Sequence, residues 1–189
     1  MNPLAKEHLT LTEYQQLEEE TNSRYEYHDG EVFAMAGGTL EHSAITANVV
    51  SLLSNLLPDN CRPFESNLKV YVTAAKKGLY PDVSVACRPV DRMREINAIT
   101  NPILLVEVLS KSTANYDRGE KFWFFSQLAS LREYVLIEQD SWKVETRYRE
   151  SADKNWEMAY FEGEGTQVAL RSLSLSLPMD QLYKNSADF

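Results

Sequence analysis

The chain has 189 residues, 43% of them hydrophobic and 25% charged, which is the composition of one soluble globular domain with a substantial core. The formal net charge of -9 argues against a general nucleic-acid binder, because attraction to phosphate needs positive charge. Residues 60–121 differ from the rest, with ten Lys and Arg against seven Asp and Glu. Solvated loop lysines explain that local excess as well as a binding surface does.

Hydropathy and cysteine content set the expected compartment. No apolar run approaches the roughly 18–20 residues of a membrane span, and the first eight residues lack the apolar stretch of a secretory signal. We therefore expect a cytoplasmic protein with no membrane partner. Cys61 and Cys87 are the only cysteines, and their spacing is not that of a metal site. We expect them to be reduced, partly buried thiols.

The amino-terminal half is expected to alternate helices with strands. Thr10 and Glu13 have the spacing of a capping box, which predicts the start of a helix. Apolar residues recur at helical spacing between Ile45 and Leu56. The predicted elements are a helix over 10–20, strands over 24–28 and 31–36 around an Asp29-Gly30 hairpin turn, a helix over 41–57, and strands over 62–73 and 79–86 joined by a turn at 74–78.

The second half is expected to complete a sheet. Its sequence pattern predicts a polar loop over 88–101, an apolar strand over 103–109, a helix near 115–129 and a strand over 132–138. Beyond Asp140, alternating segments over 142–148 and 156–161 predict a β-meander, and a short helix follows Pro178. We find no repeat and no domain boundary. The prediction is a single domain over 1–189 of the α/β or α+β class, with a mixed sheet flanked by helices.

Two acidic residues occupy positions in apolar runs where a charge is unexpected. Asp82 lies near the start of the run over 80–85, and Glu107 lies inside the run over 103–109. A buried carboxylate is costly unless it is paired, hydrogen-bonded or bound to a cation. If the two strands are neighbours, these carboxylates can hold one hard divalent metal ion together.

The chemistry of such a site follows from its ligands. Mg²⁺ takes oxygen ligands, usually one or two carboxylates completed by waters and substrate phosphate. The main-chain carbonyl of Val108, at the strand end beside Glu107, is a further candidate ligand. Lys121, on the following helix, is placed to position or deprotonate a water, or to stabilise charge on phosphorus. Asp82, Glu107 and Lys121 together are the equipment of a metal-dependent phosphodiesterase.

Each residue also has an ordinary structural reading. A Pro-Asp pair at a strand start is common turn chemistry, which applies to Asp82. Glu107 has a simple salt bridge to Lys121 or to an arginine as its main competing interpretation. Lys121 alone would be a solvated helix lysine. The three in this order favour function.

Six short stretches of the chain resemble the Uma2 family, formerly a domain of unknown function abundant in cyanobacteria. The resemblance covers about residues 8–150 and keeps the order of the motifs. The stretches are Tyr25-Glu26-Tyr27-His28-Asp29-Gly30-Glu31, Glu41-His42, Tyr80-Pro81-Asp82-Val83, Val106-Glu107-Val108-Leu109-Ser110-Lys111-Ser112-Thr113, Asp117-Arg118-Gly119-Glu120-Lys121 and Arg132-Glu133-Tyr134.

The resemblance implies a fold and an activity. Uma2 is grouped with the PD-(D/E)xK restriction-endonuclease-like superfamily. Membership implies a restriction-endonuclease-like core with a central mixed sheet flanked by helices, to which this chain would add its carboxyl-terminal meander. It also implies cleavage of DNA that depends on Mg²⁺ or Mn²⁺.

One position departs from the superfamily pattern. The pattern places a lysine two residues after the second acid, where this chain has Leu109. The resemblance implies that the lysine role has moved to the next helix, which points to Lys121. Lys111 is the rival, but relatives carry a proline or small residue there. Without an adequate lysine, the fold would persist as a catalytically inactive nucleic-acid-binding module.

Glu31 and His42 are secondary candidates, because relatives carry similar residues at both places. Glu31 is a candidate for a second metal ion or its water, and His42 has a structural helix-start role as its competing interpretation. Glu26 is interpreted as a sheet residue paired with a cation such as Arg24. A homodimer is expected, because cutting both DNA strands usually takes two sites, and the aromatic meander offers a surface for it. A homodimeric interaction module without catalysis is the remaining alternative.

Overall fold

The computed structural model describes residues 8–35 and 37–186. Residues 1–7, on which the expectation of no secretory signal partly depends, and Ala36, the predicted end of the second hairpin strand, lie outside that range. The helices and helical turns are α1 (Leu11–Thr21), α2 (Leu40–Leu56), η1 (Thr73–Ala75), η2 (Arg94–Ile96), α3 (Ala114–Tyr116), the π-helical turn η3 (Asp117–Lys121), α4 (Phe122–Phe125) and α5 (Met179–Leu182). No helix of the described residues is long and apolar enough to cross a bilayer.

The strands form two six-stranded sheets and one hairpin. Sheet A has the order β2 (Glu31–Ala34), β1 (Tyr25–His28), β5 (Lys77–Leu79), β4 (Lys69–Val72), β8 (Ala98–Ile99) and β7 (Arg92–Met93). Sheet B has the order β12 (Glu157–Glu162), β11 (Lys143–Tyr148), β10 (Glu133–Glu138), β9 (Leu104–Leu109), β6 (Val83–Cys87) and β3 (Cys61–Glu65). The separate hairpin pairs β13 (Gln167–Leu170) with β14 (Leu175–Pro178).

Sheet B is the central mixed sheet, because β9 and β10 run parallel while its other neighbours are antiparallel. Alternate residues along a strand point to opposite faces, and the two faces have different covers. Val106 and Val108 of β9 pack with α2, α5 and the β13–β14 hairpin. Leu105 and Leu109 pack with α4 and with β4 and β5 of sheet A. Glu107 shares this second face, which directs its side chain towards the segment that carries Lys121.

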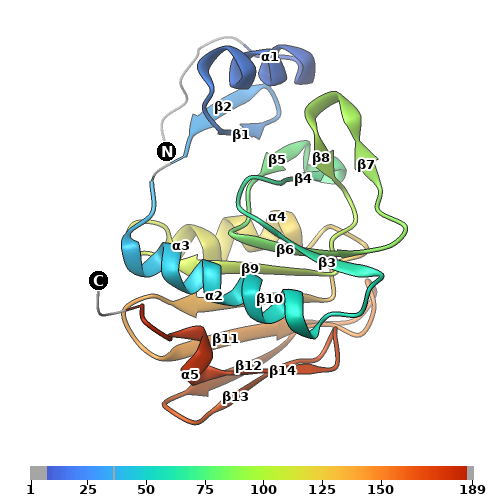
Figure 1. Cartoon of the computed structure of the whole chain (residues 1–189). Coiled ribbons are helices and arrows are strands. Elements are labelled where there is room, and N and C mark those ends of the chain that lie inside the picture. The colour runs from blue at the N-terminus through green and yellow to red at the C-terminus, as the bar shows by residue number, and fades with distance from the viewer. Residues whose placement is uncertain (1–7, 36, 187–189) are drawn as a thin grey trace.

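Sheet A is covered by α1 on the side away from sheet B. Figure 1 shows α1 and the β1–β2 hairpin at one end of the molecule and the β13–β14 hairpin at the other. Tyr14 of α1 packs against Tyr27 of β1, with the ring planes tilted by 35°, in a separate small core. The predicted capping box holds the start of α1: Thr10 N donates to Glu13 Oε2 at 2.7 Å, and Glu13 N donates to Thr10 Oγ1 at 3.3 Å.

The predicted α+β class with a central mixed sheet is confirmed, and several element boundaries differ from the prediction. The strand predicted over 62–73 is split into β3 and β4, and the strand over 79–86 is divided by Pro81 into β5 and β6. The polar segment over 88–101 contains β7, η2 and β8. These breaks let the chain leave sheet B and build sheet A. The helix predicted to reach 129 ends at Phe125, and β13 and β14 were not predicted.

The expectation of reduced cysteines is wrong. Cys61 on β3 and Cys87 on β6 form a disulfide, and no described cysteine is free. The reason is strand register: β3 and β6 pair antiparallel with these two residues directly opposite each other. A loop of 26 residues in sequence is closed by this bond.

Candidate active site

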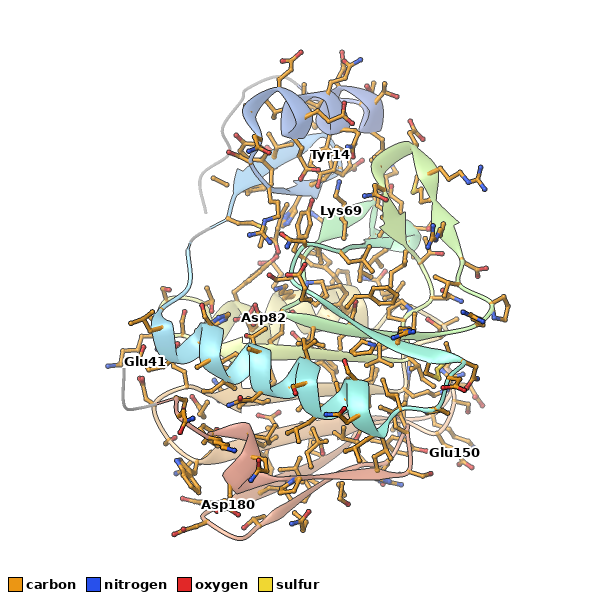
Figure 2. The ribbon with its side chains drawn as sticks, viewed as in Figure 1. Tyr14, Glu41, Lys69, Asp82, Glu150 and Asp180 are labelled. Carbon is orange, nitrogen blue, oxygen red and sulfur yellow. A yellow bond between two sulfur atoms is a disulfide. The ribbon has the colours of Figure 1, made fainter. Side chains whose placement is uncertain are left out.

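Asp82, directly before the start of β6, lies beside the middle of β9. Val83 is opposite Val106 in the antiparallel register, so the residue before Val83 comes next to Glu107. Beyond the first residue of β6, the Asp82 side chain replaces the main-chain pairing of the two strands: its Oδ2 accepts a hydrogen bond from the main-chain N–H of Val108 at 2.7 Å. The predicted adjacency of the two acids is therefore present. In Figure 2, Asp82 lies in the middle of the molecule, between sheet B and the part that carries Tyr14 and Lys69.

Lys121 reaches the same place from the π-helical turn η3. Its Nζ lies 2.9 Å from Glu107 Oε2 and 3.0 Å from the main-chain carbonyl oxygen of Tyr80. Asp117 Oδ1, one turn earlier, is 3.6 Å away, and Glu26 Oε1 of sheet A is 3.9 Å away. π-Helical turns are rare and occur frequently at functional sites. Here the turn brings a buried acid and a buried lysine into one cluster.

Negative charge exceeds positive charge around this lysine. Burial alone would lower the pKa of Lys121, but the carboxylates of Glu107, Glu26 and Asp117 outweigh it, so the pKa is raised and the ammonium stays charged. Burial raises the pKa of Glu107 well above its ordinary value, and the neighbouring Asp117 and Asp82 raise it further. The pKa of Asp117 is also raised, mainly by burial. The cluster therefore gains stability from an added proton or an added cation.

One oxygen of the cluster has no partner within the described chain. Glu107 is 2% exposed, and its Oε1 is buried without a hydrogen bond. No group of three or more His, Cys, Asp and Glu side chains among residues 8–35 and 37–186 is arranged to hold a metal ion. Two carboxylates are enough for Mg²⁺, which completes its shell with waters and phosphate. The donors present fit that ion better than one needing a full protein cage.

His42 contacts the exposed side of Asp82. Its Nε2 is 3.1 Å from Asp82 Oδ2, and its main-chain N–H donates to the N-capping Thr39 at the start of α2. Burial alone would lower the pKa of His42, but the hydrogen bond and the charge of Asp82 outweigh it, so the pKa is raised. Gly38 lies so close that a β-carbon there would come 3.0 Å from His42 Nδ1. The loop before α2 thus fixes the imidazole against the acid.

A cleft of ≈ 190 Å³ opens over these groups. One side is formed by the loop before α2, including Gly37 and Thr39, and the other by the segment after β9, including Ser110 and Thr113. Asp82, Glu107 and Lys121 all line it. The site is therefore reached from solvent and is not sealed within the core.

A family model matches the chain over residues 11–180 under the description "Putative restriction endonuclease", with the name Uma2. The chain belongs to the Uma2 family. It is similar to two uncharacterised proteins of Synechocystis sp. (strain ATCC 27184 / PCC 6803 / Kazusa). It is 36% identical to slr1290 over 180 residues, covering 95% of this chain and 93% of the relative. It is 34% identical to sll1609 over 162 residues, covering 85% and 91%.

A solved structure shares its fold with nearly the whole chain. The crystal structure of "a putative nuclease belonging to DUF820" from Anabaena variabilis ATCC 29413 is similar with a TM-score of 0.71. The match covers 93% of this chain and 97% of that one, at 22% sequence identity. At that identity the likeness supports the fold alone.

Three positions discussed for this Uma2 chain lie outside the cleft. Glu31 is exposed at the start of β2, opposite His28 in the hairpin register. Lys111 has a side chain that is 90% exposed, with its Nζ 3.6 Å from Asp140 Oδ2. Leu109 is buried in the core between sheet B and α4. The structure therefore brings Lys121, and not Lys111, to the two acids.

Three residues that the sequence analysis did not assign to the site also line the cleft: Glu26, Tyr116 and Asp117. Asp117 stands four residues before Lys121, a spacing that places two side chains on one helix face and was readable from the sequence. Glu26 was interpreted as a partner of Arg24, but Arg24 donates to Ser66 O. Contact of Glu26 with this site depends on how the two sheets pack, which sequence spacing does not reveal.

Proposed function

We propose that this Uma2 protein is a metal-dependent endonuclease that hydrolyses DNA phosphodiester bonds. Asp82 and Glu107 hold Mg²⁺ or Mn²⁺, together with the main-chain carbonyl of Val108. The N–H and C=O of a single strand residue point to the same edge of the strand. The hydrogen bond from the Val108 N–H to Asp82 therefore indicates that the Val108 carbonyl also points towards Asp82. The bound ion would polarise the scissile phosphate and lower the pKa of a coordinated water.

Lys121 positions the attacking water and stabilises negative charge near phosphorus. It does not serve as the general base, because the surrounding carboxylates raise its pKa and keep the ammonium protonated. Its Nζ–H groups point to Glu107 Oε2 and to Tyr80 O, so the amine is held directly against a metal-ligand candidate. His42 orients Asp82 by holding Oδ2, which leaves Oδ1 for the ion.

The observation that carries the proposal is the unpartnered Oε1 of the buried Glu107. A buried carboxylate oxygen without a partner destabilises the folded protein. A salt bridge to Lys121 with a purely structural role would not require this unpartnered oxygen. The excess of acidic over basic side chains around Glu107 likewise favours a bound cation. A divalent cation resolves both features at once.

The direct test is a plasmid-nicking assay with purified protein in Mg²⁺, in Mn²⁺ and in EDTA. We expect cleavage only with the divalent ions, and a loss of at least about 100-fold in Glu107→Gln. Glu133→Gln is the matched control, since Glu133 is an equally buried carboxylate that instead accepts hydrogen bonds from Arg171 and Ser172. Cleavage that persists undiminished in Asp82→Ala and Glu107→Ala would come from a contaminant and would end the proposal.

A second candidate is a catalytically inactive nucleic-acid-binding module on the same fold. The observation that favours it is Leu109, an apolar residue at the position of the superfamily lysine. Calorimetric titration with Mg²⁺ and Mn²⁺ separates the two functions. Heat of binding that disappears in Asp82→Ala supports the nuclease, and a silent titration supports the inactive module.

The proposed enzyme acts on DNA as a homodimer in the cytoplasm, where its Cys61–Cys87 disulfide would be an exception among proteins of that compartment. Within the aromatic meander, Met158 and Tyr160 are 57% and 72% exposed on β12, the edge strand of sheet B. Trp142 instead stacks on Tyr183, and Trp156 packs on Phe122. The dimer surface is therefore β12, and light scattering of wild type against Tyr160→Lys tests it: the variant should be monomeric.

A further inference from the structure

Glu26 enters the site from the opposite sheet. Alternation along β1 directs Tyr27 to α1, where it packs against Tyr14, so Glu26 and His28 face the other way, towards sheet B. The ring of His28 packs against Phe124 of α4 on that face. The carboxylate of Glu26 is thereby buried in the cleft, although its strand belongs to sheet A.

The contacts of Glu26 hold its carboxylate in one orientation. Its Oε2 accepts a hydrogen bond from the hydroxyl of Tyr116 at 2.9 Å and lies 3.5 Å from His28 Nε2. Its other oxygen, Oε1, is directed to Lys121, with Oε1 and Nζ 3.9 Å apart. The residue is fixed at one oxygen and presents the second to the ammonium.

Glu26 differs electrostatically from the other acids near Lys121. Burial would raise the pKa of Glu26, but contacts with His28, Lys121 and Tyr116 outweigh it, so the pKa lies below its ordinary value. Burial raises the pKa of Glu107 and of Asp117 instead. Of these three acids, Glu26 is the one whose surroundings favour the ionised form.

We propose that Glu26 is a positioning residue that holds the ammonium of Lys121 in place when Glu107 is engaged by the metal ion. The proposal rests on the proposed function. An ammonium has three N–H donors, and in this structure one of them is given to Glu107 Oε2. Coordination draws electron density of Glu107 to the ion and weakens that hydrogen bond. The fixed, ionised Glu26 then supplies the counter-charge, and it ties sheet A to the reaction centre on sheet B.

The test compares Glu26→Gln and Glu26→Asp with Glu18→Gln. Glu26→Gln keeps an oxygen for Tyr116 but removes the charge, and Glu26→Asp keeps the charge. Glu18 is the matched control, because it also pairs with a buried lysine of sheet A, with Glu18 Oε2 and Lys69 Nζ 2.7 Å apart. We expect Glu26→Gln to lower kcat by about 10–100-fold with KM changed less than about threefold. Glu26→Asp should recover part of kcat, and Glu18→Gln should keep it.

Two results would overturn the proposal. The first is a kcat of Glu26→Gln equal to that of wild type. The second is a loss of kcat in Glu18→Gln as large as the loss in Glu26→Gln, with the two variants at the same Tm, which would indicate a general loosening of sheet A. If wild type cleaves no DNA with any divalent ion, the nuclease proposal fails, and crystal structures of wild type and Glu26→Gln soaked with Mn²⁺ decide about Glu26. A displaced Lys121 ammonium in Glu26→Gln supports the positioning role, and an unmoved one refutes it.

Discussion

Glu107 and Lys121 form one salt bridge, yet neutralising each of them should move stability in opposite directions. Lys121→Met leaves three buried carboxylates without their ammonium. Breaking a buried pair in this way costs about 3–5 kcal/mol, because the remaining charge is uncompensated. For a domain of this size, that corresponds to a fall in Tm of about 6–20 °C.

Glu107→Gln should leave the free protein as stable as wild type, or more stable. Lys121 retains Asp117 and Glu26, and the carboxylate with the strongly raised pKa is gone. The sign with pH follows from linkage: above about pH 4.5 the unfolded chain has released the proton of Glu107, while the folded chain keeps it. Wild type therefore loses stability as pH rises through this window, by up to about 1.4 kcal/mol per pH unit, and Glu107→Gln does not.

The assay is urea unfolding in EDTA at several pH values from 5 to 9, followed by fluorescence. The stability of Glu107→Gln relative to wild type should increase with pH until the folded-state pKa is passed. If Glu107→Gln and Lys121→Met are destabilised equally at every pH, the two residues form an ordinary balanced ion pair. The excess of buried negative charge, and the argument for a cation built on it, would then be refuted.

Three further perturbations have defined outcomes. Reducing the Cys61–Cys87 bond should lower the free energy of unfolding by about 3–4 kcal/mol for a loop of this length, measured in urea with and without dithiothreitol, and the reductant should have no effect on Cys61→Ser. Burial raises the pKa of Glu133, so wild type should lose stability as pH rises above about 4.5, and Glu133→Gln should lack this loss. Identical profiles of unfolding free energy against pH for the two proteins would contradict this. Gly38→Ala should displace His42 and reduce cleavage with little change in Tm, because the added β-carbon meets the imidazole; unchanged kcat would show that the ring position is unimportant.

The two acids of the candidate site could be predicted from the sequence because the reason for choosing them is local. Carboxylates in apolar strands are expensive, so Asp82 and Glu107 stand out without knowledge of the fold. Asp117, four residues before Lys121, was overlooked although helix spacing places the two side chains on one face. Convergence of the two acids needed only that their strands be neighbours in the sheet, and β6 and β9 pair although β7 and β8 lie between them in the chain.

What sequence reasoning missed depends on contacts between distant segments. Glu26 reaches Lys121 only because sheet A packs over sheet B, and no local pattern encodes that packing. The disulfide required the exact pairing of β3 with β6, where a shift of one residue would separate Cys61 from Cys87. Sheet A was not predicted as a separate sheet because several of its strands are short, with two residues each in β7 and β8.

The most direct measurement is the anomalous difference density of a crystal soaked in Mn²⁺. The account predicts one peak between the carboxylates of Asp82 and Glu107, within coordinating distance of an oxygen of each, and no peak there in Glu107→Gln. A saturating soak that leaves this position empty while wild-type protein cleaves DNA would contradict the central claim, because the chemistry would then take place elsewhere on the molecule.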